Sequence, residues 1–254
     1  MPATSSEDTR WLAAAAALAS RGRPLSRPNP AVGAVVVANG VAVGRGWTQA
    51  GGRPHAEALA LEQAGEAARG ATLYVTLEPC AHDSERGPCC TGLAIAAGVK
   101  RVVAGLEDPD PRTAGSGLAS LRDSGIMAEL ADDAACRASL AGYLSLRQQG
   151  RPFVTLKLAL SIDGCIALAD GSSRWITGEA ARAHAHLERA RSDAILVGGG
   201  TLRADDPRLD VRLPGLEGRS PQRCVLTGGE APAGWTGLST PEDIFSLDDT
   251  QYRL

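Results

Sequence analysis

The sequence predicts an α/β fold divided into two units. Helical and strand patterns alternate over residues 1–149, a second and shorter α/β pattern follows, and the turn-forming run Gly150-Arg151-Pro152 separates the two. We therefore expect one unit over residues 1–149 and another over residues 150–254. A chain of 254 residues has room for one large or two modest domains and can bury an ample core without disulfides.

The first unit should begin with a helix over about residues 9–20, followed by a hairpin. Its two strands cover 34–38 and 41–45, and the intervening Asn39-Gly40 is the strongest short hairpin signal. Patterns of period 3.6 and short apolar runs then predict, in chain order, helix 57–64, strand 71–77, helix 90–97, strand 101–104, helix 118–124, strand 126–130 and a helix over about 132–148. Together these elements predict a layered α/β core.

The second unit shows fewer elements. An apolar strand over 154–160 should start it, and the later elements are helix 179–191, strand 194–197 and strand 223–227. After Gly228-Gly229 the pattern dissolves, and residues 230–254 are rich in Pro, Gly and Asp.

Composition restricts the partners that we expect. Lys and Arg number 26 against 29 Asp and Glu, which gives a net charge of −3 and leaves no basic surplus to bind nucleic acid. The alanine-rich stretch 12–18 is too short and too weakly apolar to span a bilayer. Six cysteines without a secretory leader indicate reduced thiols and metal ligands in a cytoplasmic protein. We expect a homo-oligomer that binds a small molecule.

The run His55-Ala56-Glu57, followed by Pro79-Cys80 and Pro88-Cys89, predicts a zinc site for hydrolytic deamination. One imidazole and two thiolates supply three ligands, a fourth position stays open for water, and Glu57 moves protons without binding the metal. The H-x-E and P-C…P-C order therefore indicates a nucleoside-type deaminase.

The predicted elements place these residues near one another. Residues two apart on a helix point about 200° away from each other, so His55 and Glu57 can share an ion only at a helix start, where Pro54 is well tolerated. Cys80 follows a strand, at the edge where α/β sites form. Cys89 opens a helix whose positive N-terminal end favours a thiolate.

Other cysteines and histidines carry weaker signals. Cys90 is expected to be a packing or bystander thiol, because only Cys89 follows the proline. Three further cysteines show no metal spacing and are expected to be structural: Cys136, Cys165 and Cys224. His184 and His186 are expected on a solvated helix face. His82 either contacts a substrate or is a loop histidine that bonds the backbone.

Longer motifs resemble the riboflavin-biosynthesis deaminases and the reductase fused to them. In the deaminase half these are Asn29-Pro30-Ala31-Val32-Gly33-Ala34-Val35, Thr76-Leu77-Glu78-Pro79-Cys80-Ala81-His82, Pro88-Cys89 and Asp108-Pro109-Asp110-Pro111 with Gly115-Ser116-Gly117. In the reductase half they are Arg151-Pro152-Phe153-Val154-Thr155-Leu156-Lys157, Ser161-Ile162-Asp163-Gly164, Ser173-Arg174-Trp175-Ile176-Thr177, Val197-Gly198-Gly199-Gly200-Thr201 and Asp205-Asp206-Pro207. The resemblance runs from about residue 10 to about residue 227.

The resemblance implies a three-layer cytidine-deaminase-like domain over 1–149, with zinc held by His55, Cys80 and Cys89. The implied substrate is 2,5-diamino-6-ribosylamino-4(3H)-pyrimidinone 5′-phosphate, with Asn29, His82 and Arg86 as the substrate-binding residues. The family carries a cation in the loop before Pro88. In this chain that position corresponds either to Arg86, displaced by one residue, or to Glu85, whose negative charge would repel a substrate phosphate.

For residues 150–254 the resemblance implies a partial, dihydrofolate-reductase-like α/β domain that uses NADPH. Its implied substrate and cofactor positions are Lys157, Ala159, Ser173, Trp175, Thr177, Arg189, Thr201, Asp205, Leu209 and Arg212. The sequence ends before the Gly-rich turn and helix that receive the cofactor phosphates in such a domain. We therefore expect a shortened domain that does not turn over NADPH.

Two alternatives stay open at this point. A tRNA adenosine or free-nucleoside deaminase would share the H-x-E motif and the cysteines, but not the motifs between residues 151 and 212. A non-catalytic remnant is the other alternative, and an intact Glu57 weakens it.

Overall fold

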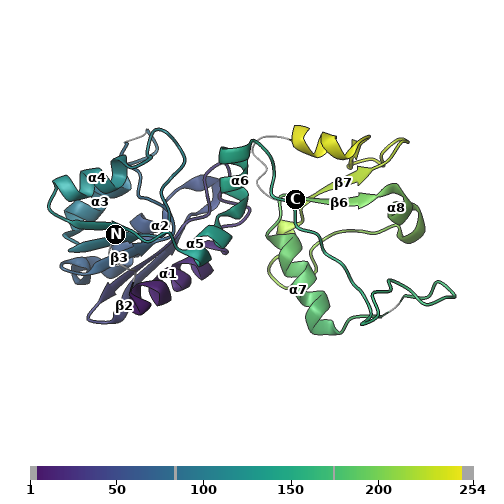
Figure 1. Cartoon of the computed structure of the whole chain (residues 1–254), viewed down its shortest axis with the longest axis horizontal. Helices are drawn as coiled ribbons and strands as arrows, with labels where there is room; N and C mark the ends of the chain where they lie inside the picture. Colours follow the sequence, from purple (N-terminus) through teal and green to yellow (C-terminus); the bar gives the residue numbers. More distant parts are fainter. Residues whose placement is uncertain (1–4, 83–84, 174, 248–254) are drawn as a thin grey trace. The chain divides into compact units, whose positions relative to one another are not determined.

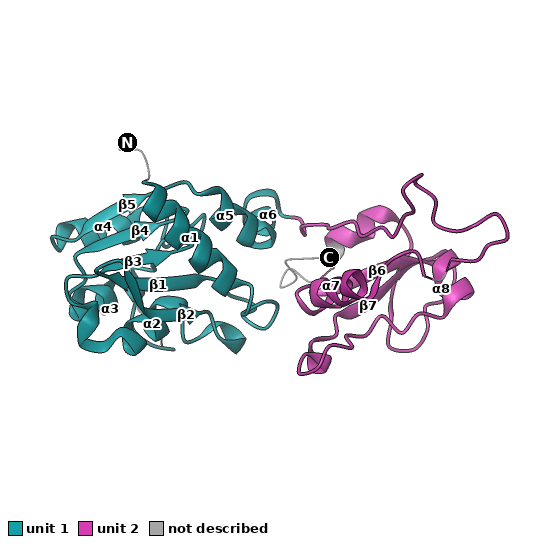
Figure 2. Cartoon of the chain, turned by 90° about the horizontal axis from the view of Figure 1, so that it is seen from below, with its two compact units in different colours: residues 1–150 teal, residues 151–254 magenta. Residues whose placement is uncertain are grey.

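The computed structural model describes residues 5–82, 85–173 and 175–247. The chain forms two compact units, Met1–Gly150 and Arg151–Leu254, which Figure 2 shows in teal and magenta. Each unit has its own sheet. Among the described residues, no helix has both the length and the apolar character needed to cross a bilayer.

The first unit is built on a five-stranded mixed sheet with the order β2-β1-β3-β4-β5. The strands are β1 (Gly33–Ala38), β2 (Val41–Trp47), β3 (Thr72–Val75), β4 (Arg101–Ala104) and β5 (Met127–Leu130). Strand β1 runs antiparallel to β2 and β3, whereas β3, β4 and β5 are parallel. The expected hairpin is confirmed, because Ala38 pairs with Val41 across Asn39 and Gly40, which both have positive φ.

Helices cover both faces of this sheet (Figures 1 and 2). One face carries α1 (Ser6–Ala19) and α5 (Ala134–Ser139), and the other carries α2 (Ala56–Ala64) and α3 (Cys90–Ala97). The remaining helices of the unit are α4 (Ser116–Asp123) and α6 (Ala141–Gln149), with short 3-10 turns η1 (Ala50–Gly52) and η2 (Gly65–Ala68). The expected layered α/β core is therefore confirmed.

Small residues let the helices approach the sheet closely. A Cβ at Gly46 would lie 2.1 Å from the Ala56 carbonyl oxygen, and one at Gly44 would lie 2.0 Å from that of Ala60. Both contacts are closer than a side chain tolerates, so α2 packs directly on the β2 backbone. This packing fixes the start of α2 against the sheet, and the candidate site depends on that position.

One helix prediction is wrong in its extent. The expected helix over 132–148 is divided into α5 and α6 at Leu140, whose dihedrals (φ −102°, ψ 7°) leave the α-helical range. The Leu140 side chain is buried at 2% exposure. The break turns α6 into a separate element, and its side chains Tyr143 and Arg147 line the cavity described below.

The second unit has a parallel three-stranded sheet with the order β6-β7-β8. Its elements are α7 (Glu179–Ala190), β6 (Ala194–Gly198), α8 (Gly199–Asp205), η3 (Glu217–Arg219), β7 (Gln222–Leu226), β8 (Thr236–Leu238) and η4 (Pro241–Ser246). Ala194, Cys224 and Leu238 form its buried core cluster.

Two expectations for this unit are wrong. Residues 154–160 do not form a strand, because they pair with no strand of the described chain, and Val154, Leu156, Leu158 and Leu160 are exposed. The pattern also does not dissolve after Gly229. Strand β8 pairs with β7 and buries Leu238. The sequence around Leu238 has few apolar residues and therefore did not indicate a strand.

Candidate active site

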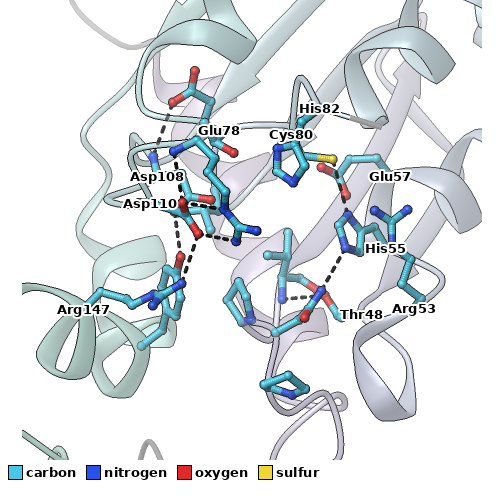
Figure 3. Close-up of a pocket in the computed structure, with 18 of the residues that line it drawn as sticks. Thr48, Arg53, His55, Glu57, Glu78, Cys80, His82, Asp108, Asp110 and Arg147 are labelled. Atoms are coloured by element: carbon cyan, nitrogen blue, oxygen red, sulfur yellow. Dashed lines mark hydrogen bonds and ion pairs between the residues drawn. The ribbon is translucent and has the colours of Figure 1, made fainter. Parts of the chain in front are cut away.

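A cavity of about 240 Å³ opens at the carboxyl ends of β3 and β4 in the first unit (Figure 3). Loops that follow parallel strands converge at this edge of a sheet, which is where ligand sites of α/β proteins form. Its lining is strongly polar. It consists of Pro28, Asn29, Pro30, Val32, Thr48, Arg53, His55, Glu57, Leu77, Glu78, Cys80, His82, Arg86, Asp108, Asp110, Arg112, Thr113, Tyr143 and Arg147.

One wall of the cavity holds a group of three possible metal ligands. The ligand atoms of His55, Cys80 and Cys90 lie within 4.8 Å of one another. His55 Nδ1 is 3.8 Å from the Cys80 sulfur and 3.3 Å from the Cys90 sulfur. Tetrahedral zinc, with bonds of about 2.0 Å to nitrogen and 2.3 Å to sulfur, spaces such atoms about 3.5 Å apart. The donor set and its spacing fit zinc.

Local structure explains how these atoms meet. His55 is the N-cap of α2, with an extended backbone (φ −71°, ψ 161°) that turns its ring away from the helix axis. Cys80 follows β3, and its sulfur accepts a hydrogen bond from the backbone N–H of Cys90 at 3.3 Å. The start of α3 therefore presents one backbone N–H and its positive dipole end to this sulfur.

The structure differs from the sequence expectation at the second cysteine. Cys89, the expected third ligand, is the N-cap of α3, and its sulfur accepts from the Thr91 hydroxyl at 3.4 Å. The group near His55 contains Cys90 instead, which sequence analysis set aside as a bystander. The two residues are adjacent at one helix start, where a small change in direction decides which sulfur faces the group.

Electrostatics in this wall favour one charged thiolate. The hydrogen bond from the Cys90 thiol, followed by that of His55, lowers the pKa of Cys80 to about 4. The hydrogen bond with Cys80, followed by burial, raises the pKa of Cys90 well above its usual value. Burial works against a charged His55, but the hydrogen bond with Cys80 and the charge of Glu57 outweigh it, so the pKa of His55 is raised.

Glu57 lies in the first turn of α2 and is only 3% exposed. Burial raises the pKa of its carboxyl above the usual range, although the nearby His55 works in the opposite direction. In Figure 3 the Glu57 carboxyl lies beside Cys80 and His55. A buried carboxyl with a raised pKa next to a metal-binding group is suited to accept and return a proton.

Two further side chains can bind a ring placed in the cavity. The Asn29 amide donates to the Gly52 carbonyl at 3.2 Å and lies 3.1 Å from His55 Nε2. His82 Nδ1 is buried and has no hydrogen-bond partner among the described residues. An unpaired buried nitrogen is costly, so His82 has a donor or acceptor available for a ligand.

Arg86 and Arg53 lie on the loops that border the same cavity. An Arg86 guanidinium N–H donates to the Gly51 carbonyl, and Arg53 Nη1 donates to the Pro88 carbonyl at 3.2 Å. These bonds link the segment before α2 to the loop before α3.

The opposite wall carries residues that sequence analysis did not select. Asp108 and Asp110 follow β4, and Tyr143 and Arg147 come from α6. The Tyr143 hydroxyl donates to Asp108 at 2.7 Å, and Arg147 forms an ion pair with Asp110 at 3.0 Å. The Asp-Pro-Asp-Pro motif was the sequence signal for Asp108 and Asp110. No sequence signal indicated Tyr143 and Arg147, because both lie more than 30 residues after this motif.

The expected reductase positions are spread over the second unit. Lys157 and Ala159 lie in the exposed segment that forms no strand, and Ser173 and Trp175 are also exposed. Thr177 accepts from Arg182 through its carbonyl, while Thr201 and Asp205 belong to α8. Arg189 donates to the Asp210 carbonyl at 3.1 Å, close to Leu209 and Arg212. The structure therefore brings Arg189 to the segment that carries Leu209 and Arg212.

Two family matches divide the chain in the same way as the fold. Residues 5–106 match the cytidine and deoxycytidylate deaminase zinc-binding region, and residues 152–233 match the RibD C-terminal domain. The first unit is thus a zinc-binding deaminase domain of the cytidine-deaminase type, joined to a domain of the kind that ends RibD proteins.

Whole-chain comparisons agree with these matches. The riboflavin biosynthesis protein RibD of Haemophilus influenzae is 50% identical over 210 residues, which are 82% of this chain and 56% of the relative. RibD of Escherichia coli is 48% identical over 83% of this chain and 58% of its own length. The chain therefore spans somewhat more than half the length of these curated relatives.

Solved structures give the same result. Acinetobacter baumannii RibD superimposes with a TM-score of 0.75 and 38% identity, covering 98% of this chain and 73% of that one. A Thermotoga maritima diaminohydroxyphosphoribosylaminopyrimidine deaminase/5-amino-6-(5-phosphoribosylamino)uracil reductase gives 0.80 and 33%, covering 95% and 76%. The chain belongs to the RibD family. The presence of both domains disfavours the tRNA adenosine and free-nucleoside alternatives.

Proposed function

We propose that this chain acts in riboflavin biosynthesis as a zinc-dependent deaminase of 2,5-diamino-6-ribosylamino-4(3H)-pyrimidinone 5′-phosphate. The observation that carries the proposal is the buried Glu57 beside the His55, Cys80 and Cys90 group, in a cavity lined by hydrogen-bonding side chains. The names of the related structures, which include a diaminohydroxyphosphoribosylaminopyrimidine deaminase, support the choice of substrate.

The proposed ligands are His55, Cys80 and one sulfur of the adjacent pair Cys89 and Cys90. The motif supports Cys89, and the spacing of the ligand atoms supports Cys90. When bound, zinc supplies Lewis acidity that lowers the pKa of a water molecule toward neutrality.

The roles of the remaining residues follow from their positions. Glu57 takes one proton of the attacking water and delivers it to the ring nitrogen, and it then takes the second proton from the added hydroxyl and delivers it to the amino group, which departs as ammonia. Asn29 and His82 hold the pyrimidine by hydrogen bonds, and Arg86 adds positive charge at the loop that borders the cavity. Because the walls are polar, the polar groups of a bound substrate can form the hydrogen bonds that water forms with the walls when the cavity is empty.

Ammonia release tests the proposal. The purified chain is offered the pyrimidine ribose phosphate, cytidine and an adenosine-containing tRNA hairpin in parallel, with Glu57→Gln as the inactive control. Release from the first substrate alone supports the proposal. Release from cytidine or the hairpin at a comparable rate, or no release from any of the three, would overturn it.

For the second unit we propose contacts to the ribosyl substrate without NADPH turnover by this chain. Lys157 and Ala159 lie on an exposed segment outside the β6-β7-β8 sheet, so they are not held against Asp205 by a shared sheet. Catalysis needs its groups fixed to within a fraction of an ångström. Absorbance of NADPH should therefore stay constant when the deaminated product is added. A product-dependent decrease that Asp205→Ala abolishes would contradict this.

We also propose a homo-oligomeric assembly, which light scattering of the purified chain can check.

A further inference from the structure

The wall opposite the metal-binding group carries two arginines. Arg112 and Arg147 approach the cavity from the loop after β4 and from α6, and both guanidiniums contact the same carboxylate, that of Asp110. The distances are 2.6 Å for Arg112 and 3.0 Å for Arg147. Two guanidiniums therefore face this one carboxylate, and the cavity lining also carries the carboxylates of Glu78 and Asp108.

Asp110 acts as a fixed support for these two cations. Its side chain is 9% exposed, whereas those of Arg112 and Arg147 are 67% and 46% exposed. Arg112 donates to the Asp110 carboxylate through both Nε and Nη2, and these hydrogen bonds hold the pKa of Asp110 well below the usual range. The carboxylate is therefore charged at neutral pH and orients both guanidiniums.

Arg112 keeps hydrogen-bonding capacity at the cavity. Nη1 of Arg112 has no hydrogen-bond partner among the described residues. The nearby carboxylates, in contrast, are already occupied. Glu78 accepts from the backbone N–H groups of Gly115 and Leu118 at 2.9 Å each, and Asp108 accepts from Tyr143 and from the Asp110 backbone.

We propose that Arg112 and Arg147 bind the phosphate of the substrate and set the preference for a phosphorylated pyrimidine. This inference rests on the proposed deaminase function. The ring lies at the wall with Glu57 and His55, and the ribosyl phosphate extends across the cavity to the wall with Asp110 and Arg147, as the labelled residues of Figure 3 are arranged. Guanidinium groups suit this role because their planar forks bind phosphate oxygens in pairs.

The test compares two substrates that differ only in the phosphate. Steady-state deamination of the pyrimidine ribose phosphate and of its dephosphorylated nucleoside is measured for wild type, Arg112→Gln, Arg147→Gln and the double variant. The double variant should raise KM for the phosphorylated substrate about ten- to hundredfold, while KM for the nucleoside changes less than about twofold. The matched control is Arg137→Gln on α5, an exposed arginine outside the cavity that also pairs with an aspartate.

Three results would overturn the inference. One is an equal rise of KM for both substrates. Another is a loss of phosphate preference in Arg53→Gln or Arg86→Gln but not in the double variant, which would place the phosphate on the loop side. The third is a double variant that behaves like Arg137→Gln.

Two additions keep the test decisive. If the double variant misfolds because the Asp110 carboxylate is left unpaired, the substitution Asp110→Asn is added to remove the unpaired charge, and the triple variant is measured instead. A ³¹P NMR titration with ribose 5-phosphate measures binding without turnover. Absence of ammonia release by the wild type would refute the proposed function. The phosphate site is tested separately: weaker binding of ribose 5-phosphate to the variants than to the wild type supports it, and equal binding refutes it.

Discussion

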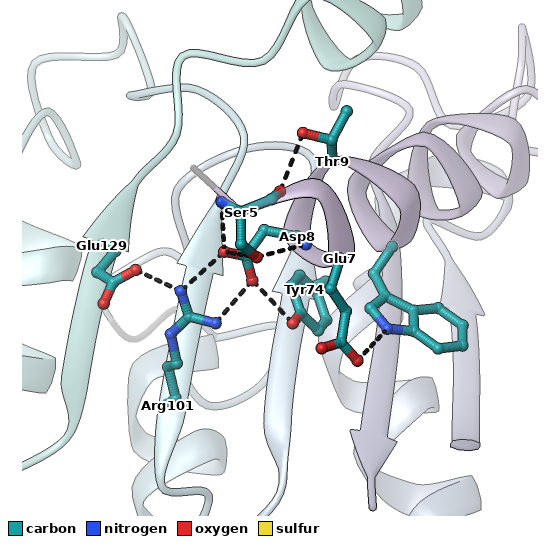
Figure 4. A network of polar contacts seen from close by, with 8 residues as sticks. Ser5, Glu7, Asp8, Thr9, Tyr74, Arg101 and Glu129 are labelled. Atoms are coloured by element: carbon teal, nitrogen blue, oxygen red, sulfur yellow. Dashed lines mark hydrogen bonds and ion pairs between the residues drawn. The ribbon is translucent and has the colours of Figure 1, made fainter. Parts of the chain in front are cut away.

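Arg101 Nη1 lies 2.7 Å from Asp8 Oδ1, and this ion pair joins the first helix to strand β4 of the sheet (Figure 4). Asp8 is 3% exposed and also accepts from the Tyr74 hydroxyl at 2.9 Å, while Arg101 reaches Glu129 on β5. Ser5 and Asp8 form a capping box at the start of α1. One buried carboxylate thus ties α1, β3 and β4 together.

Removal of this carboxylate should destabilise the first unit. Asp8→Asn leaves Arg101 without its main partner, and loss of one member of a largely buried pair costs roughly 3 kcal/mol. Urea denaturation followed by circular dichroism measures the free energy of unfolding. The exposed pair Arg137 and Asp132 is the control, and Asp132→Asn should cost less than about 1 kcal/mol. Equal losses in the two variants would show that the pair of Asp8 and Arg101 contributes no more than an exposed ion pair.

The same pair should make stability depend on acid. The hydrogen bond from Arg101 lowers the pKa of Asp8 in the folded chain far below its ordinary value. The unfolded chain therefore takes up a proton first, so the stabilisation is full above about pH 5 and is lost progressively as the pH falls through and below about 4. The free energy of unfolding of the wild type should fall over this window more steeply than that of Asp8→Asn. Parallel pH profiles would exclude the linkage.

Metal content tests the proposed ligands. The purified chain should hold about one zinc ion, and His55→Ala or Cys80→Ser should each reduce this to near zero. Of the variants Cys89→Ser and Cys90→Ser, one should lose zinc, because adjacent residues at a helix start do not aim both sulfurs at one ion. The motif predicts the loss in Cys89→Ser and the geometry predicts it in Cys90→Ser. Full zinc content in both variants would refute a site with three protein ligands.

Glu57→Gln separates proton transfer from metal binding. The amide has the size of the carboxyl but cannot take a proton, so zinc content should stay near one per chain while kcat falls about 10²- to 10⁴-fold. Metal analysis and ammonia release are measured on the same sample. A fall of less than about tenfold would mean that another group carries the proton.

His82→Ala should affect substrate binding. Its unpaired buried Nδ1 indicates a ligand contact, so KM should rise about tenfold with zinc content and kcat nearly unchanged. His184→Ala, on α7 in the second unit, is the control and should leave KM unchanged. Loss of zinc in the His82 variant would instead make His82 a metal ligand.

Short stretches of the sequence encode the local part of the site. Pro54 and the helical pattern over 57–64 predicted a helix start, the apolar run before Glu78 predicted a strand end, and the helix over 90–97 begins at Cys90 as expected. These features depend on propensities, capping and period, which act over a few residues. The hairpin at Asn39 and Gly40 is determined in the same way.

Long-range packing sets which distant residues complete the cavity. Tyr143 and Arg147 reach Asp108 and Asp110 because the chain breaks at Leu140, and no local pattern encodes where the following helix packs. The segment 154–160 shows the converse, since its apolar pattern predicts a strand but a strand also needs a neighbour to pair with. The choice of sulfur near His55 has the same cause: adjacent cysteines look alike in sequence, and the packing of α3 against the turn after β3 sets the direction of each side chain.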